Sequence, residues 1–119
     1  MKTTVIITFQ LEGIHNWPEA KQVFPDVAFL SDPHRHMFHF KMSKLVTHTD
    51  RDVEFIRWKR EVIEYLHNMY DRAGISGARQ YLDFGRMSCE DIATKLLRWF
   101  DCEYVEVWED GENGARVEK

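Results

Sequence analysis

Apolar and polar residues alternate along two N-terminal segments, which is the pattern of half-buried β-strands. Residues 4–11 form the first segment. The second begins at His34 and divides its side chains between two faces, because successive strand residues point to opposite sides. One face carries His34, His36, Phe38, Phe40 and Met42, and the other carries Arg35, Met37, His39 and Lys41. The pattern predicts two strands, the second of which places two histidines in line with a row of apolar core residues.

Two segments in the middle of the chain repeat their apolar residues at helical spacing instead. Thr49 and Asp52 have the spacing of a capping box and predict a helix that runs to about Tyr70. Ser88 and Asp91 form a second capping box, which predicts a second helix. The apolar stripes of the two helices consist of Phe55, Trp58, Val62, Leu66 and Met69, and of Ile92, Ala93, Leu96, Leu97 and Phe100. Each helix is therefore expected to cover an apolar surface.

Alternation returns near the C-terminus and completes the order of elements. Residues 104–109 are typical of a strand, turn-forming residues follow at 110–114, and a last short strand is expected at 115–118. Residues 16–33, with three prolines, and residues 71–87, with three glycines, are predicted loops. The order ββααββ predicts an α+β fold in which two helices cover one face of an antiparallel sheet. The sheet's other face needs a cover, so we expect a homo-oligomer.

The composition is that of one globular domain. With 119 residues, of which 44% are hydrophobic and 30% charged, we expect a single domain spanning residues 1–119. A net charge of −4 and the lack of a long Lys/Arg run argue against nucleic acid as a partner. Neither a signal peptide nor a membranous composition is found, so we expect a cytoplasmic protein without a membrane partner. Cys89 and Cys102 are too few for a disulfide framework and are expected to be packed thiols, although a disulfide between them stays open.

The histidines carry the candidate chemistry of the chain. His34 and His36 lie on one strand face, separated by two residues at roughly 3.3 Å each, which is close enough to share one metal ion. His15 lies just beyond the first strand, and a hairpin between the two strands would bring it beside them. Three neutral imidazoles with one open position are the ligand set of a catalytic zinc site. The alternative is that His34 and His36 are half-buried residues satisfied by hydrogen bonds. The remaining histidines are expected to be solvated or capping residues: His39, His48 and His67.

Several stretches, taken in order, resemble the 6-pyruvoyl-tetrahydropterin synthase family and its bacterial relative 6-carboxy-tetrahydropterin synthase. The family's first strand has a Phe followed by a ligand His, matched here by Phe9 and His15, and its His-Gly-His-Asn-Tyr strand is matched by His34-Arg35-His36-Met37-Phe38. The family's Asp-Phe-x-x-Leu-Lys resembles residues 54–59, and its Pro-Thr-x-Glu-Asn-Ile-Ala resembles residues 87–93. Its closing strand, which ends in a pterin-binding Glu, resembles residues 105–109. The likeness runs from about residue 5 to residue 118.

The resemblance implies a fold, a cofactor and a ligand. It implies the tunnelling fold, a Zn²⁺ ion held by His15, His34 and His36, and a hexamer of paired trimers. It also implies a pterin or deazapurine precursor as the ligand and a lyase-type reaction. Glu109 corresponds to the pterin-binding Glu, and a carboxylate can accept two parallel hydrogen bonds from the N–H and NH₂ edge of such a ring. The alternative for Glu109 is a solvated residue at the end of a strand.

The likeness fails at the family's acid–base residues. Leu30 stands where the family has a catalytic Cys, four residues before His34, and residues 71–87 contain no counterpart of its catalytic His. Asp83, in that loop, and Asp32, near His34, remain as candidate catalytic residues. We therefore expect the family's usual reaction to be absent or slow. The alternative function is a non-catalytic tunnelling-fold protein that binds a purine-like or pterin-like ligand or serves as an assembly subunit.

Overall fold

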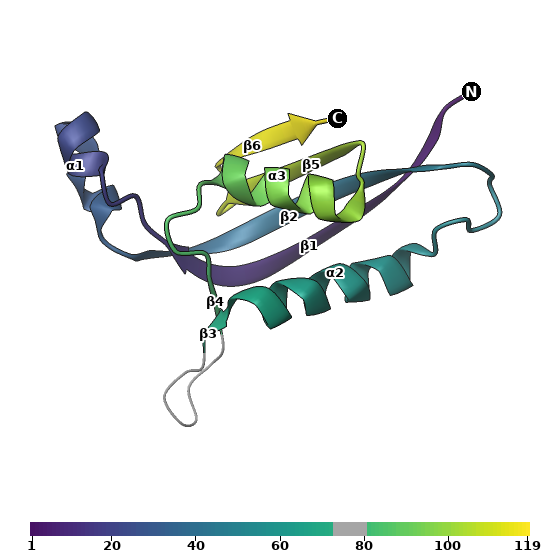
Figure 1. Ribbon diagram of the computed structural model, residues 1–119, viewed down its shortest axis with the longest axis horizontal. Helices are drawn as coiled ribbons and strands as arrows, with labels where there is room; N and C mark the ends of the chain where they lie inside the picture. The colour runs from purple at the N-terminus through teal and green to yellow at the C-terminus, as the bar shows by residue number, and fades with distance from the viewer. Residues whose placement is uncertain (73–80) are drawn as a thin grey trace.

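Two long antiparallel strands form the centre of the sheet in the computed structural model, which describes residues 1–72 and 81–119. β1 (Thr3–His15) and β2 (His34–Val46) pair along their whole length, from Thr3 opposite Val46 to His15 opposite His34. β5 (Tyr104–Glu109) pairs with the other side of β2, and β6 (Asn113–Glu118) forms the edge beyond it. Figure 1 shows this long, twisted sheet with its strands running side by side. The alternation in the sequence thus predicted the two central strands, although β1 continues to His15 and β6 begins at Asn113.

Two short strands extend the sheet beyond the predicted ββααββ order. β3 (Asp71–Arg72) and β4 (Tyr81–Asp83) follow the first long helix, and β4 pairs with β1 in parallel. The sheet therefore has the order β3-β4-β1-β2-β5-β6 and is mixed, where the sequence predicted a purely antiparallel sheet. Strands of two and three residues give too short an alternation to be recognised in a sequence. The rest of the predicted 71–87 loop includes residues 73–80, which lie outside the described residues.

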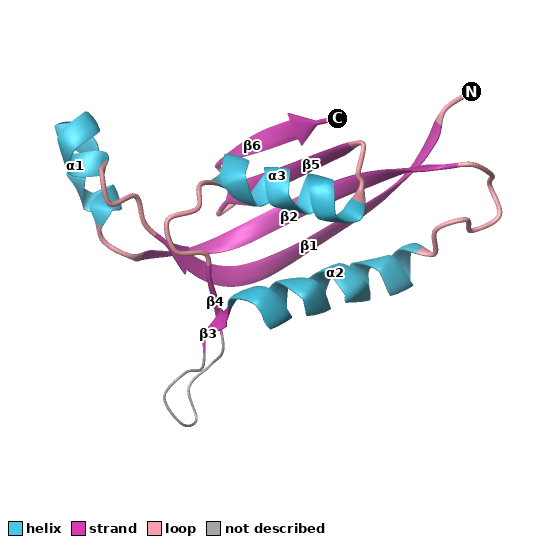
Figure 2. Ribbon diagram, viewed as in Figure 1, coloured by secondary structure: helices cyan, strands magenta, loops and turns pink. Residues whose placement is uncertain are grey.

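Both long helices cover the same face of the sheet (Figure 2). α2 (Phe55–Tyr70) packs beside β1, and α3 (Cys89–Phe100) packs over β5 and β6. The core between them is lined by fully buried side chains that include Phe38, Phe40, Met42, Val62, Leu66, Ile92, Leu96, Val105 and Val107. The predicted stripe of α2 is buried at its centre, whereas Phe55 and Met69, at its two ends, are about half exposed at 52% and 53%. The two-helix layer is therefore as predicted, with a shorter apolar contact for α2.

The starts of the two helices gave opposite outcomes. The predicted capping box of Ser88 and Asp91 is present, with both reciprocal hydrogen bonds. The predicted box of Thr49 and Asp52 is wrong, because α2 begins later and is capped by the Glu54 carboxylate, which accepts the N–H groups of residues 56 and 57. The Asp52 carboxylate instead accepts hydrogen bonds from the N–H and hydroxyl of Thr47, at the end of β2. Asp52 therefore bonds to Thr47, outside the helix, and does not cap α2.

The connection between β1 and β2 is partly helical, although its prolines predicted a loop. It contains the single turn α1 (Ala20–Val23) and the 3₁₀ segment η1 (Pro25–Ser31), whose first residue is a proline, which is favoured at a helix start. Figure 1 shows these turns at the end of the hairpin. Neither these turns nor the longer helices of the described chain combine the length and apolar character that a membrane span requires.

Candidate metal centre

The end of the β1–β2 ladder brings the three predicted ligand histidines together. His15 is the last residue of β1, rather than lying beyond the strand, and it stands directly opposite His34. His36 follows two residues later on the same face of β2, as strand alternation requires. One ligand nitrogen from each ring lies within 4.8 Å of the other two. His15 is buried, and the other two rings are partly buried.

The outward-facing nitrogen of each ring is held by an oxygen of the chain. His15 Nδ1 lies 2.9 Å from the main-chain oxygen of Met87, and His34 Nδ1 lies 2.9 Å from that of Asp32. His36 Nδ1 lies 2.7 Å from the carboxylate of Asp110. Because carbonyl and carboxylate oxygens only accept hydrogen bonds, each Nδ1 must carry the hydrogen. In a neutral ring, Nε2 then carries the lone pair that a metal needs.

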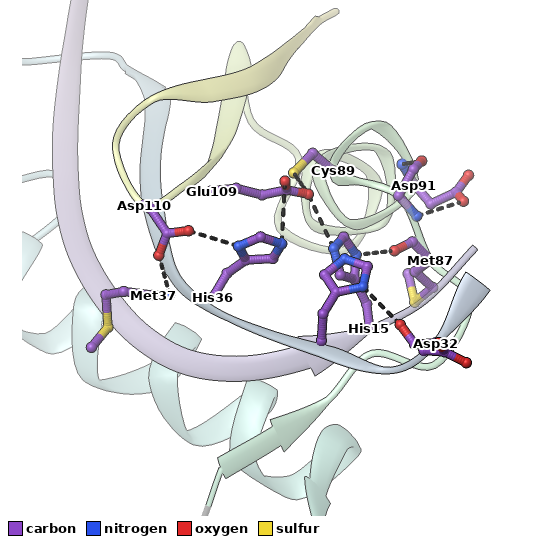
Figure 3. A network of polar contacts seen from close by, with 11 residues as sticks. His15, Asp32, His36, Met37, Met87, Cys89, Asp91, Glu109 and Asp110 are labelled. Atoms are coloured by element: carbon purple, nitrogen blue, oxygen red, sulfur yellow. Dashed lines mark hydrogen bonds and ion pairs between the residues drawn. The ribbon is translucent and has the colours of Figure 1, made fainter. Parts of the chain in front are cut away.

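Glu109 faces these lone pairs from β5 (Figure 3). Its two carboxylate oxygens lie 3.1 Å from His15 Nε2 and 3.4 Å from His36 Nε2. Both nitrogens are buried, and neither makes a hydrogen bond within the described residues. A nitrogen lone pair that faces a carboxylate oxygen is repelled, unless a proton or a cation lies near both. The donor set of neutral imidazoles beside one negative charge therefore fits a divalent cation.

The charges of the cluster are coupled through Glu109. Burial favours the neutral ring of His15, but its contacts with Glu109 and with the Met87 carbonyl outweigh burial and raise the pKa of His15 above 6.5. The contact with His15 lowers the pKa of Glu109, against the opposing effect of burial. The hydrogen bonds from His36 and from the Met37 N–H lower the pKa of Asp110. Both carboxylates are consequently ionised near neutral pH.

An open cavity of about 600 Å³ lies beside the histidines. Its lining includes His15, His34 and Glu109, together with Leu30 and Cys89. No protein-family model matches the sequence, and no curated protein matches it. The site therefore has to be interpreted from its own contacts.

Cys89 belongs to this cavity, although its position in the sequence gave no indication of it. It is the first residue of α3, and its thiol donates a hydrogen bond to Glu109 Oε2 at a sulfur–oxygen distance of 3.6 Å. Burial, together with the charge of Glu109, raises the pKa of the Cys89 thiol to about 12. Cys89 is therefore a neutral thiol at physiological pH and a poor proton acceptor. Cys102 is also buried with a free thiol, which answers the open question of a disulfide between the two cysteines.

The two predicted catalytic aspartates are not among the residues that line the cavity. Asp32 contributes its main-chain oxygen to His34. The Asp83 side chain accepts the N–H of Gly85 at 2.9 Å and lies 3.5 Å from Arg72. Their role as bases stays a prediction. Leu30, which occupies the position of the family's Cys, does line the cavity and has no group that can ionise.

The other histidines stand apart from the cluster. His39 lies on the opposite face of β2 from His36 and His34, as alternation predicted. His67, in the last turn of α2, contacts Asp71 at 2.6 Å, and His48 accepts the Asp50 N–H at 3.2 Å. Sequence reasoning also missed Asp110, the carboxylate partner of His36. An Asp-Gly pair after a strand predicts a turn, and nothing in that pattern indicates the contact of Asp110 with His36.

Proposed function

We propose that this chain is a zinc-dependent protein of pterin-synthase type that binds a pterin or deazapurine precursor. The observation that carries the metal part is the set of three outward Nδ1–H donors, which leaves one lone pair on each of His15, His34 and His36. Neutral nitrogen ligands suit Zn²⁺, and three of them leave a coordination position open to substrate. The ligand class and the tunnelling fold rest on the resemblance of the quoted motifs. The mixed α+β sheet with two helices on one face is compatible with that fold.

In this proposal the histidines, Glu109 and Cys89 have different roles. The histidines hold the metal, which when bound polarises a substrate oxygen. Glu109, which lines the cavity and has a lowered pKa, accepts hydrogen bonds from the N–H and NH₂ edge of the ring and so fixes its orientation. The Cys89 thiol donates to Glu109 and steadies that carboxylate. A lyase-type step would further require a base, for which Asp32 and Asp83 are the candidates.

The second candidate function is a non-catalytic binder of the same kind of ligand. The observation that favours it concerns two residues of the cavity lining: Leu30, at the position of the family's catalytic Cys, cannot ionise, and the Cys89 thiol, with a pKa of about 12, is a poor replacement as a base. Such a site keeps the ring-binding carboxylate and the metal but lacks the family's catalytic Cys.

Zinc analysis of purified, zinc-loaded variants tests the metal centre. The wild type is expected to hold one zinc ion per chain, and His15→Ala, His34→Ala and His36→Ala are each expected to lose most of it. His39→Ala is the matched control, because its ring lies on the same strand but the other face. A wild type without zinc would overturn the metal centre, and an equal loss in His39→Ala would show that the strand register is wrong by one residue.

Ligand binding and turnover separate the two candidate functions. Neopterin is expected to bind the wild type and to bind Glu109→Gln much more weakly, because the amide cannot accept both hydrogen bonds. Glu112→Gln, in the exposed turn beyond β5, is the control and should bind as the wild type does. Turnover of dihydroneopterin triphosphate or of a carboxylated analogue would favour the enzyme, whereas binding without turnover would favour the binder.

We also propose that copies of the chain associate through the sheet, as a hexamer if the resemblance holds. In the described part of the chain, β6 is an edge strand and β1 has only β2 beside it from residue 3 to residue 12. On the face without α2 and α3, Ile6, Leu45 and Trp108 are 46%, 48% and 37% exposed. Unpaired strand edges and exposed apolar side chains both favour association. Sedimentation showing a stable monomer at micromolar concentration would contradict this.

A further inference from the structure

Asp110 is held more firmly than a turn residue needs to be. It follows β5 with a φ of 55°, in the left-handed region, which Asp tolerates better than most residues. Its N–H donates to the Met37 carbonyl at 2.8 Å, and its Oδ1 accepts the Met37 N–H at 2.9 Å. These two bonds continue the β2–β5 ladder past Glu109 and fix the carboxylate. Oδ2 is thereby held 2.7 Å from His36 Nδ1.

The partner of His36 differs in kind from those of the other two rings. His15 and His34 donate to neutral main-chain carbonyls, whereas His36 donates to a full negative charge. A hydrogen bond to a charged acceptor is about twice as strong as a neutral one. It also pushes electron density toward the opposite nitrogen, which makes the ring a stronger metal ligand. Figure 3 shows Asp110 on the outer side of His36 and Glu109 on its inner side.

We propose that Asp110 is a positioning residue of the metal centre, which fixes His36 with its Nε2 lone pair inward and strengthens that ring as a ligand. This inference rests on the proposed zinc site. The Met37 bond alone would not require a charge, because the amide oxygen of Asn could accept the same N–H. The negative charge of Asp110 strengthens its hydrogen bond with His36, and the contacts with the Met37 backbone fix the orientation of the carboxylate.

Asp110→Asn removes the negative charge of the side chain and keeps its shape. Asn adopts left-handed φ as readily as Asp and can keep the Met37 bond, so the turn is preserved. Zinc affinity, measured by competition with a chromophoric chelator, is expected to fall about 10-fold to 100-fold. The matched control is Asp101→Asn: Asp101 also has a left-handed φ, of 52°, but its carboxylate contacts Lys119, so its zinc affinity should equal that of the wild type.

A second measurement uses the wild type alone. The ¹⁵N chemical shifts of the His36 ring in the zinc-loaded protein should identify Nδ1 as the protonated nitrogen. A third measurement compares the variants: the Co²⁺-loaded absorption spectrum should change in Asp110→Asn but not in Asp101→Asn. A wild-type affinity in Asp110→Asn, or a proton on Nε2 of His36, would overturn the role of Asp110. A wild type that binds no zinc would instead overturn the metal centre itself. If Asp110→Asn fails to fold, the ring measurement still decides.

Discussion

One face of the β1–β2 pair has an apolar half and a histidine half. Toward one end, Ile7, Phe40 and Met42 are almost fully buried among apolar side chains. Toward the other end, the same face carries His15 and His36, with two Nε2 atoms that are buried and make no hydrogen bond within the described residues. The strands, their pairing and their alternation are the same in both halves. What differs is the source of stability, because apolar burial is favourable by itself and polar burial is not.

The apolar half needs only suitable volumes, whereas the histidine half needs particular partners. The ring of Phe9 stacks on Phe40 at a centroid distance of 4.7 Å, within the β1–β2 pair itself. The histidines depend on groups from other elements: the Met87 carbonyl before α3 and the two carboxylates at the end of β5. The sheet therefore supplies the positions of the imidazoles, and the elements packed around it supply the hydrogen-bond acceptors and charges that the rings need.

Phe38→Ala has the largest expected effect, because Phe38 lies between the apolar half and the histidine half of this face. Phe38 is fully buried, and its ring lies 5.2 Å from that of His15 and 5.0 Å from that of Phe84. Its truncation leaves a cavity between the two halves and should lower the free energy of unfolding by about 3–5 kcal/mol. Urea unfolding measures this, with Phe29→Ala as the control, since Phe29 is 68% exposed and should change stability by at most about 0.5 kcal/mol. Similar losses in the two variants would show that Phe38 is not a core residue.

The pH dependence of zinc affinity tests the proposed role of the histidine half. Protons and metal compete for the same Nε2 atoms, and the fold raises the pKa of His15 above 6.5, so it favours the protonated ring. Zinc affinity should therefore begin to fall above pH 6.5 as the pH is lowered, by up to about tenfold per pH unit for each proton displaced. Glu109, with a lowered pKa, stays ionised through this range. Calorimetric zinc titrations from alkaline to mildly acidic pH measure the onset, and an affinity that does not change with pH would contradict imidazole ligation.

Ser88→Ala has the smallest expected effect and tests an element that supports the polar half. The Ser88 hydroxyl caps α3, directly after the residue whose carbonyl holds His15. Loss of the cap should reduce stability by about 1 kcal/mol in thermal unfolding. Thr94→Ala, which removes a hydroxyl inside the same helix that bonds the Glu90 carbonyl, should be neutral or slightly stabilising, because Ala is the better helix former. Equal losses in both variants would mean that the cap contributes nothing specific.

The sequence predicted what alternation and local spacing determine. His34 and His36 share the core face of β2 because they are two residues apart, and Ser88 caps α3 through a partner three residues away. Local spacing was misleading at Thr49 and Asp52, because the Asp52 carboxylate accepts the N–H of Thr47, just after β2, instead of capping the helix. The cap that the structure uses, Glu54, is not among the residue types preferred at a helix start, so the sequence did not indicate it.

The groups that hold the outward nitrogens of His15 and His36 could not be predicted, because they meet these rings from far along the chain. Asp110 lies 74 residues from His36, and Met87 lies 72 residues from His15. A turn residue and a main-chain carbonyl carry no pattern that marks them as supports of a ligand ring. Cys89 similarly looked like an ordinary residue at a helix start, and only packing of α3 against β5 brings its thiol to Glu109.

The pairing of β1 and β2 also determines which insertions and deletions the histidine cluster can tolerate. Because β1 and β2 are matched residue for residue from Thr3–Val46 to His15–His34, deletion of one residue between His36 and Phe38 would turn either the histidines or the core row to the wrong face. Insertion of one residue would do the same. The connection of residues 16–33 lies outside this ladder, but Leu30 lines the cavity and the Asp32 main-chain oxygen holds His34. A change of length confined to the exposed residues 21–26 would leave every strand residue on its own face, whereas the spacing inside each strand is fixed.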